Sequence, residues 1–206
     1  MFPKEFKLVV FTDSEYWKER ANENNVTWSD EFLSGQFVPF TTRLNHSDLP
    51  FLTSMTEWIK THYRSRLYGY TNGDIIFHSS LTEVFPQLLR FSPSVLVVGR
   101  RYNVDVDSSF LSQFASQISI DVFIEDAVRM TEQFIPVAQD FFFFSPDVIT
   151  PSNVAPVVVG RNRIDNYLLT ICKQMASCVL VDASESGTES SWLFSSHRAS
   201  SLGRFW

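Results

Sequence analysis

Runs of consecutive apolar residues recur along the chain, separated by segments whose apolar residues return every three or four positions. A consecutive run is typical of a strand buried on both faces, whereas the longer spacing is typical of a helix with one apolar face. The first run, FKLVVFTD, predicts a buried strand that ends at Asp13. Further strands are predicted within residues 67–77, 94–106 and 134–146, and at both ends of residues 157–183.

Two helices are predicted early in the chain. Residues 14–25 are highly charged and are expected to form a short helix. Residues 49–66 carry apolar residues at helical spacing, so they predict a helix with one apolar face. Ser47 or Asp48 can cap that helix, and Pro50 suits its first turn.

Three other segments are less regular. Residues 27–50 have no clear period and are expected to form a loop with one short strand. Residues 78–91 predict a helix that Pro86 should limit or kink. Residues 108–134 contain helical pieces and a possible strand at 118–124.

Strands that alternate with helices predict an α/β fold with a mostly parallel central sheet, flanked by helices on both faces. One domain is expected over residues 1–183. The serine-rich segment 184–206 has little period and is expected to be a poorly ordered tail.

Composition and charge exclude several classes of protein. The formal net charge is −6, and the chain has no cluster of basic residues, so a nucleic-acid or anionic-membrane surface is not expected. No stretch is long and apolar enough to span a bilayer, and no signal sequence precedes the first strand. A cytoplasmic location is therefore the default expectation, and the Golgi lumen is the alternative if an anchor lies upstream.

The two cysteines, Cys172 and Cys178, fall in what the pattern predicts to be one helix. A separation of six residues would place their side chains on different turns, so no disulfide is expected and a reducing compartment is slightly favoured. The glycosylation motifs Asn25-Val26-Thr27 and Asn45-His46-Ser47 matter only if the chain enters the secretory pathway.

Charged and polar residues follow several predicted strands. Ligands of open parallel sheets bind beyond the carboxyl ends of the strands, so these positions are candidates for a binding site. The candidates are Asp13, Asn72 with Asp74, Arg100 with Arg101, and the segment Arg161 to Asp165.

The tripeptide Asn72-Gly73-Asp74 supports two interpretations. The carboxylate of Asp74 and the amide oxygen of Asn72 could hold a hard divalent cation, and Gly73 would allow phosphate to approach the backbone. Alternatively, Asn-Gly could form the tight turn of a β-hairpin. The pattern leaves the two interpretations about equally supported.

The other candidates also have two interpretations each. Arg100, Arg101 and Arg161 could contact phosphate through the guanidinium fork, or they could be solvated at strand ends. Asp165 could orient or deprotonate a hydroxyl, or it could cap a helix. Asp140 is expected to be an ordinary polar residue at the start of a strand.

Familiar nucleophile and cofactor motifs are not found in the sequence. There is no Gly-x-Ser-x-Gly elbow, no zinc spacing of histidines, no Walker loop and no dinucleotide-binding fingerprint. His78 follows a predicted strand, and a solvated helix start is the expected role for it.

The succession LYGYTNGDIIF, VLVVGRRYNVDV, QDFFFFSPDVI, VVVGRNRIDNYLL and VLVDAS resembles a GT-A-type nucleotide-diphospho-sugar transferase domain. The resemblance implies a Rossmann-like fold and a glycosyltransferase that uses Mn²⁺ or Mg²⁺. It implies that Asn72 and Asp74 bind the metal, that Gly73, Arg100 and Arg161 bind the donor diphosphate, and that Asp165 is catalytic. The implied partners are a nucleotide sugar and a hydroxyl acceptor of unspecified class.

This sequence departs from the family pattern in three places. Asn72 stands where the family has the first Asp of an Asp-x-Asp motif, the first strand has no counterpart, and the pattern ends after VDAS. A non-catalytic glycosyltransferase-like binding module is therefore the alternative function. A structural α/β domain that acts through protein contacts is a third possibility.

Overall fold

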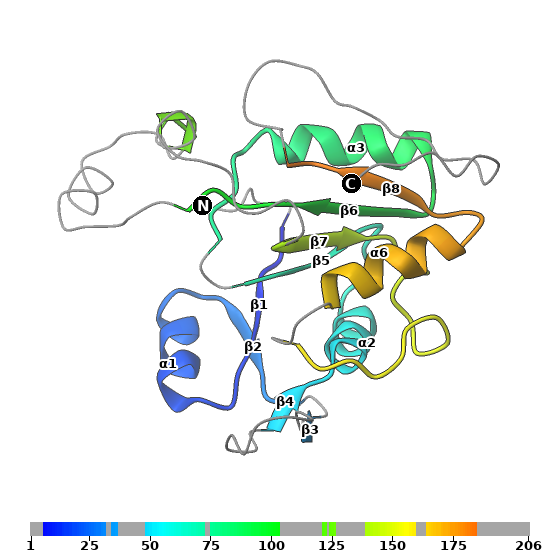
Figure 1. The fold of residues 1–206 in the computed structure, drawn as a ribbon. Helices are drawn as coiled ribbons and strands as arrows, with labels where there is room; N and C mark the ends of the chain where they lie inside the picture. Colours follow the sequence, from blue (N-terminus) through cyan, green and yellow to red (C-terminus); the bar gives the residue numbers. More distant parts are fainter. Residues whose placement is uncertain are drawn as a thin grey trace.

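A computed structural model describes residues 6–31, 34–36, 48–72, 75–103, 121–122, 124–126, 139–159 and 164–184 of the 206-residue chain. Within these residues, a central sheet of four strands has the order β5-β7-β6-β8 (Figure 1). The strands are β5 (Tyr68–Thr71), β6 (Val95–Gly99), β7 (Phe141–Phe144) and β8 (Val179–Asp182).

The central sheet is mixed, but most of its strands share one direction. β7 pairs antiparallel with β5 on one side and with β6 on the other, and β8 pairs parallel with β6. Thus β5, β6 and β8 run the same way, and only β7 opposes them. The chain therefore has the predicted α/β character with a mostly parallel sheet.

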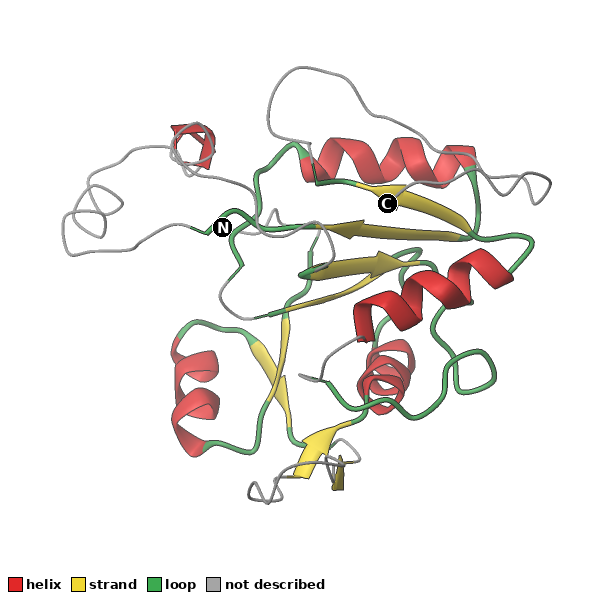
Figure 2. Ribbon diagram, in the orientation of Figure 1, coloured by secondary structure: helices red, strands yellow, loops and turns green. Residues whose placement is uncertain are grey.

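Helices cover both faces of the central sheet, as Figures 1 and 2 show. α3 (Leu81–Phe91) packs on one face, against Val95 and Val97 of β6. α2 (Leu52–His62) and α6 (Ile164–Gln174) pack on the other face, against Leu96 and Val98. Successive residues of a strand point to opposite faces, so a strand covered on both sides has to be apolar at every position.

The four phenylalanines of β7 fill the centre of both layers. Phe141 and Phe143 contribute to the core beneath α3, and Phe142 and Phe144 contribute to the core beneath α2 and α6. Their partners across the sheet include two glycines. A Cβ atom at Gly69 would lie 2.6 Å from the ring of Phe143, and one at Gly99 would lie 2.1 Å from the ring of Phe141.

These glycines are therefore required by close approach, because only a residue without a side chain leaves room for the aromatic ring that lies across from it. Gly69 is paired in register with Phe143, and Gly99 with Phe141. The ring covers the backbone that the glycine leaves open, which compensates for the missing side chain.

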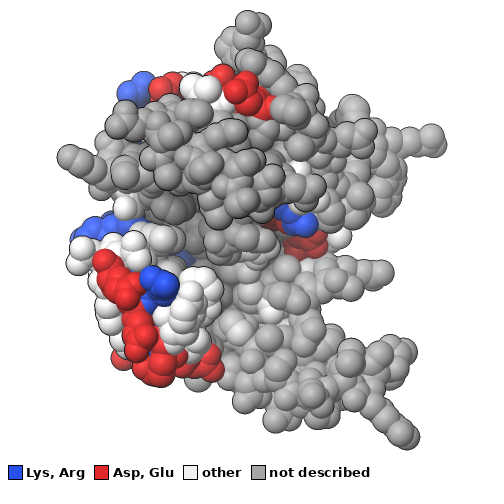
Figure 3. Space-filling view, turned by 90° about the vertical axis from the view of Figure 1, so that its left-hand side faces the viewer, with Lys and Arg blue, Asp and Glu red and all other residues white. Residues whose placement is uncertain are grey.

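The N-terminal region forms a small unit with its own two-stranded sheet, and Phe11 of this unit packs against the main core. β1 (Val9–Phe11) pairs parallel with β2 (Thr27–Ser29), and α1 (Glu15–Glu23) connects the two strands. Acidic side chains gather on the lower left of the face shown in Figure 3. Glu15 and Glu23 of α1 are exposed. β1 is a strand, as predicted, but it is only half-buried because it belongs to a two-stranded sheet.

The segment 27–50 holds more strand than expected. Besides β2, it contains β3 (Ser34–Gln36) and β4 (Asp48–Pro50), which pair antiparallel with each other. Their sequences have no alternation of apolar and polar residues, so backbone pairing alone defines these strands.

The predicted helices are found with different ends. α2 begins at Leu52 with Phe51 as its N-cap residue, so the helix starts later than predicted and Pro50 lies in β4. α3 continues through Pro86. Residues 121–122 and 124–126 are helical, so the possible strand at 118–124 is wrong over these residues.

The end of the chain differs from the prediction in two further respects. The expected strand at residues 157–160 is reduced, in the described residues, to a single bridge between Phe51 and Val158. Of the serine-rich segment only Ser184 is described, so the tail predicted at 184–206 otherwise lies outside the described residues. No described helix has the length and apolar character required to cross a bilayer.

Cys172 and Cys178 form a disulfide, with their Cα atoms 5.3 Å apart. The expectation that these cysteines stay apart was wrong because they do not share a helix. α6 ends at Gln174, and a turn closed by a hydrogen bond from Cys178 N to Met175 O brings the chain back beside α6. The reversal places Cys178 directly before β8.

Candidate functional site

Polar residues from the ends of the strands meet at one edge of the central sheet. The register pairs Thr71 with Phe141, and Phe141 with Gly99, while Val98 pairs with Asp182. The last residues of β5 and β6 therefore lie level with the first residue of β7, and the last residue of β8 lies one position further into the sheet. We call this edge the polar edge; its residues are Asn72, Arg100, Arg101, Asp140, Asp182 and Ser184, with Asp165 attached through Gln139.

The reversed direction of β7 explains why Asp140 belongs to the polar edge. Asp140 precedes β7, and its backbone N–H donates to the carbonyl of Gly99 at 2.9 Å. Its side chain is buried and forms an ion pair with the guanidinium of Arg101. The Arg101 backbone N–H also donates to Asp140 Oδ2, at 3.3 Å.

The Arg101–Asp140 pair has a structural role at this edge. A carboxylate buried without a cation would be strongly destabilised, so Arg101 compensates the burial of Asp140. The Nε of Arg101 donates to Asn103 Oδ1 at 2.8 Å, which further holds the guanidinium. Asp140 was expected to be an ordinary polar residue at the start of a strand. The four consecutive phenylalanines that follow it were the available signal that Asp140 would also be buried.

Arg100 is held differently from Arg101. Its backbone N–H and its side-chain Nε both donate to Ser184 Oγ, at 3.1 and 3.3 Å. Ser184 in turn donates its hydroxyl and its backbone N–H to Asp182 Oδ1. Within the described part of the chain Arg100 has no ion-pair partner, so it is the arginine at this edge with a guanidinium available to an anion.

Asp165 lies in the first turn of α6 and is half-buried. Its Oδ2 accepts the backbone N–H of Gln139 at 3.3 Å, and its Oδ1 accepts the N–H of Asn166 at 2.8 Å. A carboxylate in the first turn of a helix is favoured by the exposed N–H groups there. Asp165 thus stabilises the start of α6 and is also connected to the polar edge.

Gln139 has an unusual environment beside Asp165. Its side-chain Oε1 is buried and has no hydrogen-bond partner among the described residues. A buried acceptor without a donor costs about 1–3 kcal/mol.

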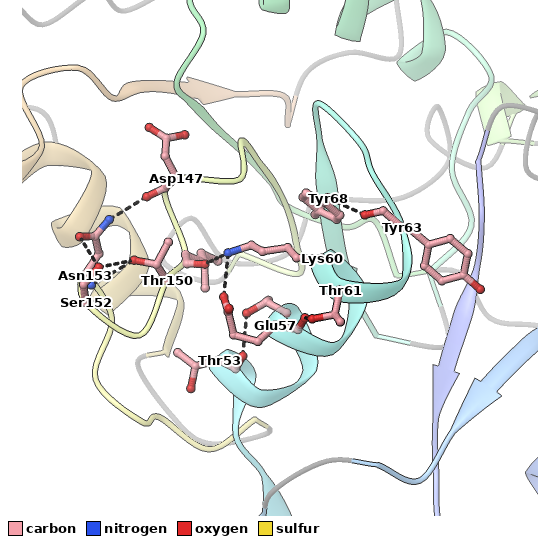
Figure 4. A network of polar contacts seen from close by, with 12 residues as sticks. Thr53, Glu57, Lys60, Thr61, Tyr63, Tyr68, Asp147, Thr150, Ser152 and Asn153 are labelled. Atoms are coloured by element: carbon pink, nitrogen blue, oxygen red, sulfur yellow. Dashed lines mark hydrogen bonds and ion pairs between the residues drawn. The ribbon is translucent and has the colours of Figure 1, made fainter.

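The loop between β7 and α6 positions Asp165, and α2 anchors that loop. Figure 4 shows Lys60 of α2 donating to the carbonyl of Ile149 and pairing with Glu57. Further along the loop, the N–H of Ala155 donates to the hydroxyl of Tyr167 in α6 at 2.8 Å. These contacts connect α2, the loop and α6 into one support.

Asn72 is exposed at the end of β5, and its Oδ1 accepts the hydroxyl of Tyr70 at 3.3 Å. Burial raises the pKa of the Tyr70 phenol to about 12, so this hydroxyl stays a donor at neutral pH. Residues 75–78 form no strand, and the predicted strand 67–77 ends at Thr71. Asn72-Gly73 is therefore not the turn of a β-hairpin.

Three of the predicted site residues, Gly73, Asp74 and Arg161, lie outside the described residues. Asp13 follows β1, which pairs with β2 and is not part of the central sheet. Among the described residues, no three His, Cys, Asp or Glu side chains form a group that could hold a metal. Asn72 contributes one exposed amide oxygen, a hard ligand of the type that Mg²⁺ and Mn²⁺ prefer.

A second polar cluster joins the start of α3 to the helical residues 121–126. Both the N–H and the hydroxyl of Ser79 donate to the carboxylate of Asp121, and His78 Nε2 lies 3.5 Å from Glu125 Oε1. Partial burial raises the pKa of Asp121. The hydrogen bonds from Ser79, together with the electrostatic effect of the His78 ring, outweigh this and hold the pKa below its usual value. His78 is thus half-buried between carboxylates, whereas a solvated helix start was expected.

Function has to be inferred from the polar edge and the sequence motifs. Comparisons of the chain with protein-family models, with curated proteins and with solved structures found no match.

Proposed function

We propose that this chain is a metal-dependent glycosyltransferase of the GT-A type, which moves a sugar from a nucleotide-diphosphate donor to a hydroxyl acceptor. The observation that carries the proposal is the convergence of Asn72, Arg100 and Asp165 on one edge of the central sheet. These residues are far apart in the sequence and represent the three chemical requirements of the reaction, namely metal, diphosphate and acceptor binding.

The donor would bind along the ends of β5 and β6. The guanidinium of Arg100, which has no carboxylate partner among the described residues, is suited to a diphosphate, which it can contact through two parallel hydrogen bonds. Arg161 is proposed to assist. Asn72 and Asp74 would hold Mn²⁺ or Mg²⁺, whose charge would offset that of the leaving diphosphate.

The acceptor would bind beside Asp165. The Asp165 carboxylate would orient the reacting hydroxyl and take its proton. The hydroxyl oxygen then forms a bond to the anomeric carbon as the bond to the diphosphate breaks. Asp140 and Arg101 would keep the edge in shape and not contact the reacting atoms.

A non-catalytic binding module is the second candidate, and one observation favours it. Both oxygens of Asp165 already accept backbone N–H groups, so its lone pairs are partly occupied by structural hydrogen bonds. Asn72 also carries no charge for a metal. In such a module the polar edge would bind the nucleotide sugar without transferring it.

The two candidates differ in turnover. The purified chain is incubated with Mn²⁺ and a panel of nucleotide sugars, with water and simple glycosides as acceptors, and release of nucleoside diphosphate is measured. Asp165→Asn should lower kcat by about 100-fold or more, as expected for a lost general base, while the thermal shift caused by the donor is retained. Asp13→Asn, at an exposed position outside the central sheet, is the matched control and should leave kcat unchanged.

Arg100→Gln should weaken the donor-induced thermal shift, because it removes the guanidinium without a large change in size. A donor-induced thermal shift that depends on Arg100, without nucleotide release, would contradict the glycosyltransferase and support the binding module. A folded chain with neither donor-induced shift nor nucleotide release would contradict both, and would leave the structural α/β domain.

A further inference from the structure

The glycosylation motif Asn25-Val26-Thr27 lies in the turn that connects α1 to β2. We propose that Asn25 carries an N-linked glycan, and that the folded chain therefore resides in an oxidising, secretory compartment. Two independent observations support this modification site: the accessibility of the turn, and the disulfide that joins α6 to the residue before β8.

Asn25 is well placed to carry a large polar group. It is exposed, and its backbone φ of 52° lies in the left-handed region, which few side chains other than asparagine tolerate in a tight turn. Asn24, one residue earlier, donates its side-chain amide to the carbonyl of Arg20 at 2.8 Å and so completes the end of α1. No described residue forms a hydrogen bond with the Asn25 side-chain amide, so a glycan there would break no contact of the described fold.

Thr27 supplies the hydroxyl that the motif requires. It is exposed on the first residue of β2, and its Oγ1 accepts only a long hydrogen bond, 3.3 Å, from the hydroxyl of Tyr63. Val26 between them is not proline, which would block the motif. The attachment site and the recognition hydroxyl are thus on the same accessible turn.

The disulfide indicates the compartment. Cys172 and Cys178 are the only cysteines of the chain, and they are joined to each other. Cys172 is fully buried, in the core between α6 and the central sheet. Buried structural disulfides form and persist in oxidising compartments, which are also where N-linked glycans are attached. The slight preference for a reducing compartment is therefore reversed.

Site mapping on the full chain tests this inference. The chain is purified from the cells that naturally produce it and, in parallel, from a eukaryotic host that directs it to the secretory pathway. Enzymatic deglycosylation in heavy-oxygen water then labels each residue that carried a glycan, and mass spectrometry of non-reduced peptides reports the disulfide. We expect label at Asn25 together with a linked Cys172–Cys178 peptide in both preparations.

Matched variants in the eukaryotic host separate the glycan from folding effects. Asn25→Gly removes the acceptor but keeps a residue suited to positive φ, and Thr27→Ala removes the motif while keeping Asn25. Both should lose one glycan, whereas Thr27→Ser should keep it. Every chain in this comparison also carries Asn45→Gln, which removes the second glycosylation motif, so a change in mass reports the glycan at Asn25 alone.

The inference is overturned if the natural chain has an unlabelled Asn25, or if Cys172 and Cys178 are free thiols in it. It is also overturned if the host-produced chains with Thr27→Ala and with Thr27→Ser carry the same glycan mass. Each measurement is independent of transferase activity, so failure of the proposed enzyme function would leave it intact.

Discussion

β6 and β1 begin from the same kind of sequence and reach different environments. Both are runs of consecutive apolar residues, VLVVG and VVF. β6 lies inside the central sheet between α3 on one face and α2 with α6 on the other, and all its residues are buried. Every residue of β1 is only half-buried. An apolar run therefore predicts a strand, whereas burial depends on the number of layers that cover it.

The difference extends to the polar residues that follow the strands. Arg100 and Arg101 after β6 are organised by Ser184 and Asp140 from neighbouring strands. Asp13 after β1 is exposed. Only the central sheet has enough neighbouring strand ends to assemble a site, and the following experiments test how far the two regions differ.

Removing a large core side chain should have the largest effect. Phe144 of β7 is fully buried, and Phe144→Ala should lower the free energy of unfolding by about 3–5 kcal/mol through lost burial and a remaining cavity. Phe11→Ala in half-buried β1 removes the same atoms and should cost roughly half of that or less. Urea denaturation of both variants provides the measurement. Equal losses would mean that the two-stranded unit is as well packed as the central sheet.

Reducing the disulfide should have an intermediate effect, confined to the central sheet. Cys172 and Cys178 are six residues apart, and the chain-entropy estimate for so short a loop is about 2 kcal/mol of stability. Urea midpoints are compared with and without reductant. The double variant Cys172→Ala/Cys178→Ala should not respond to reductant, and a response by that variant would show that reductant acts elsewhere.

Alkaline pH should produce the smallest effect. Burial raises the pKa of Tyr70 from 10.0 to about 12, so the unfolded chain loses this proton first. The neutral phenol therefore stabilises the fold fully below pH 10, and this contribution falls as pH rises towards 12, by about 1.4 kcal/mol at pH 11. Tyr70→Phe should remove that decline when the stabilities of the two chains are compared at neutral pH and at pH 11. An equal decline in both chains would contradict the burial of Tyr70.

Much of the fold could be predicted from local pattern. The strands FFFF and VLVVG, the helices α2, α3 and α6, and the α/β class follow from periodicity alone, because each of these segments buries an apolar face. Local pattern failed where pairing had no apolar signal. β3 and β4 are held by backbone hydrogen bonds, and their sequences SGQ and DLP carry no alternation.

The candidate site could be predicted only in part. The sequence identified Asn72, Arg100 and Asp165 because they follow strands or begin a helix. It did not identify Ser184, and it gave Asp140 little weight, because their importance arises from partners 84 and 39 residues away. No local pattern encodes such a partner.

The sequence by itself determined the apolar strands of the central sheet and the helices that cover it, since a strand covered on both faces must be apolar at successive positions and a helix only along one side. Tertiary structure alone decided the direction of β7, the pairing of the two cysteines and the meeting of the polar strand ends. Each of these depends on where the chain turns and which strand becomes a neighbour. Such choices are set by the packing of the whole core, whose energy is distributed over residues distant in sequence.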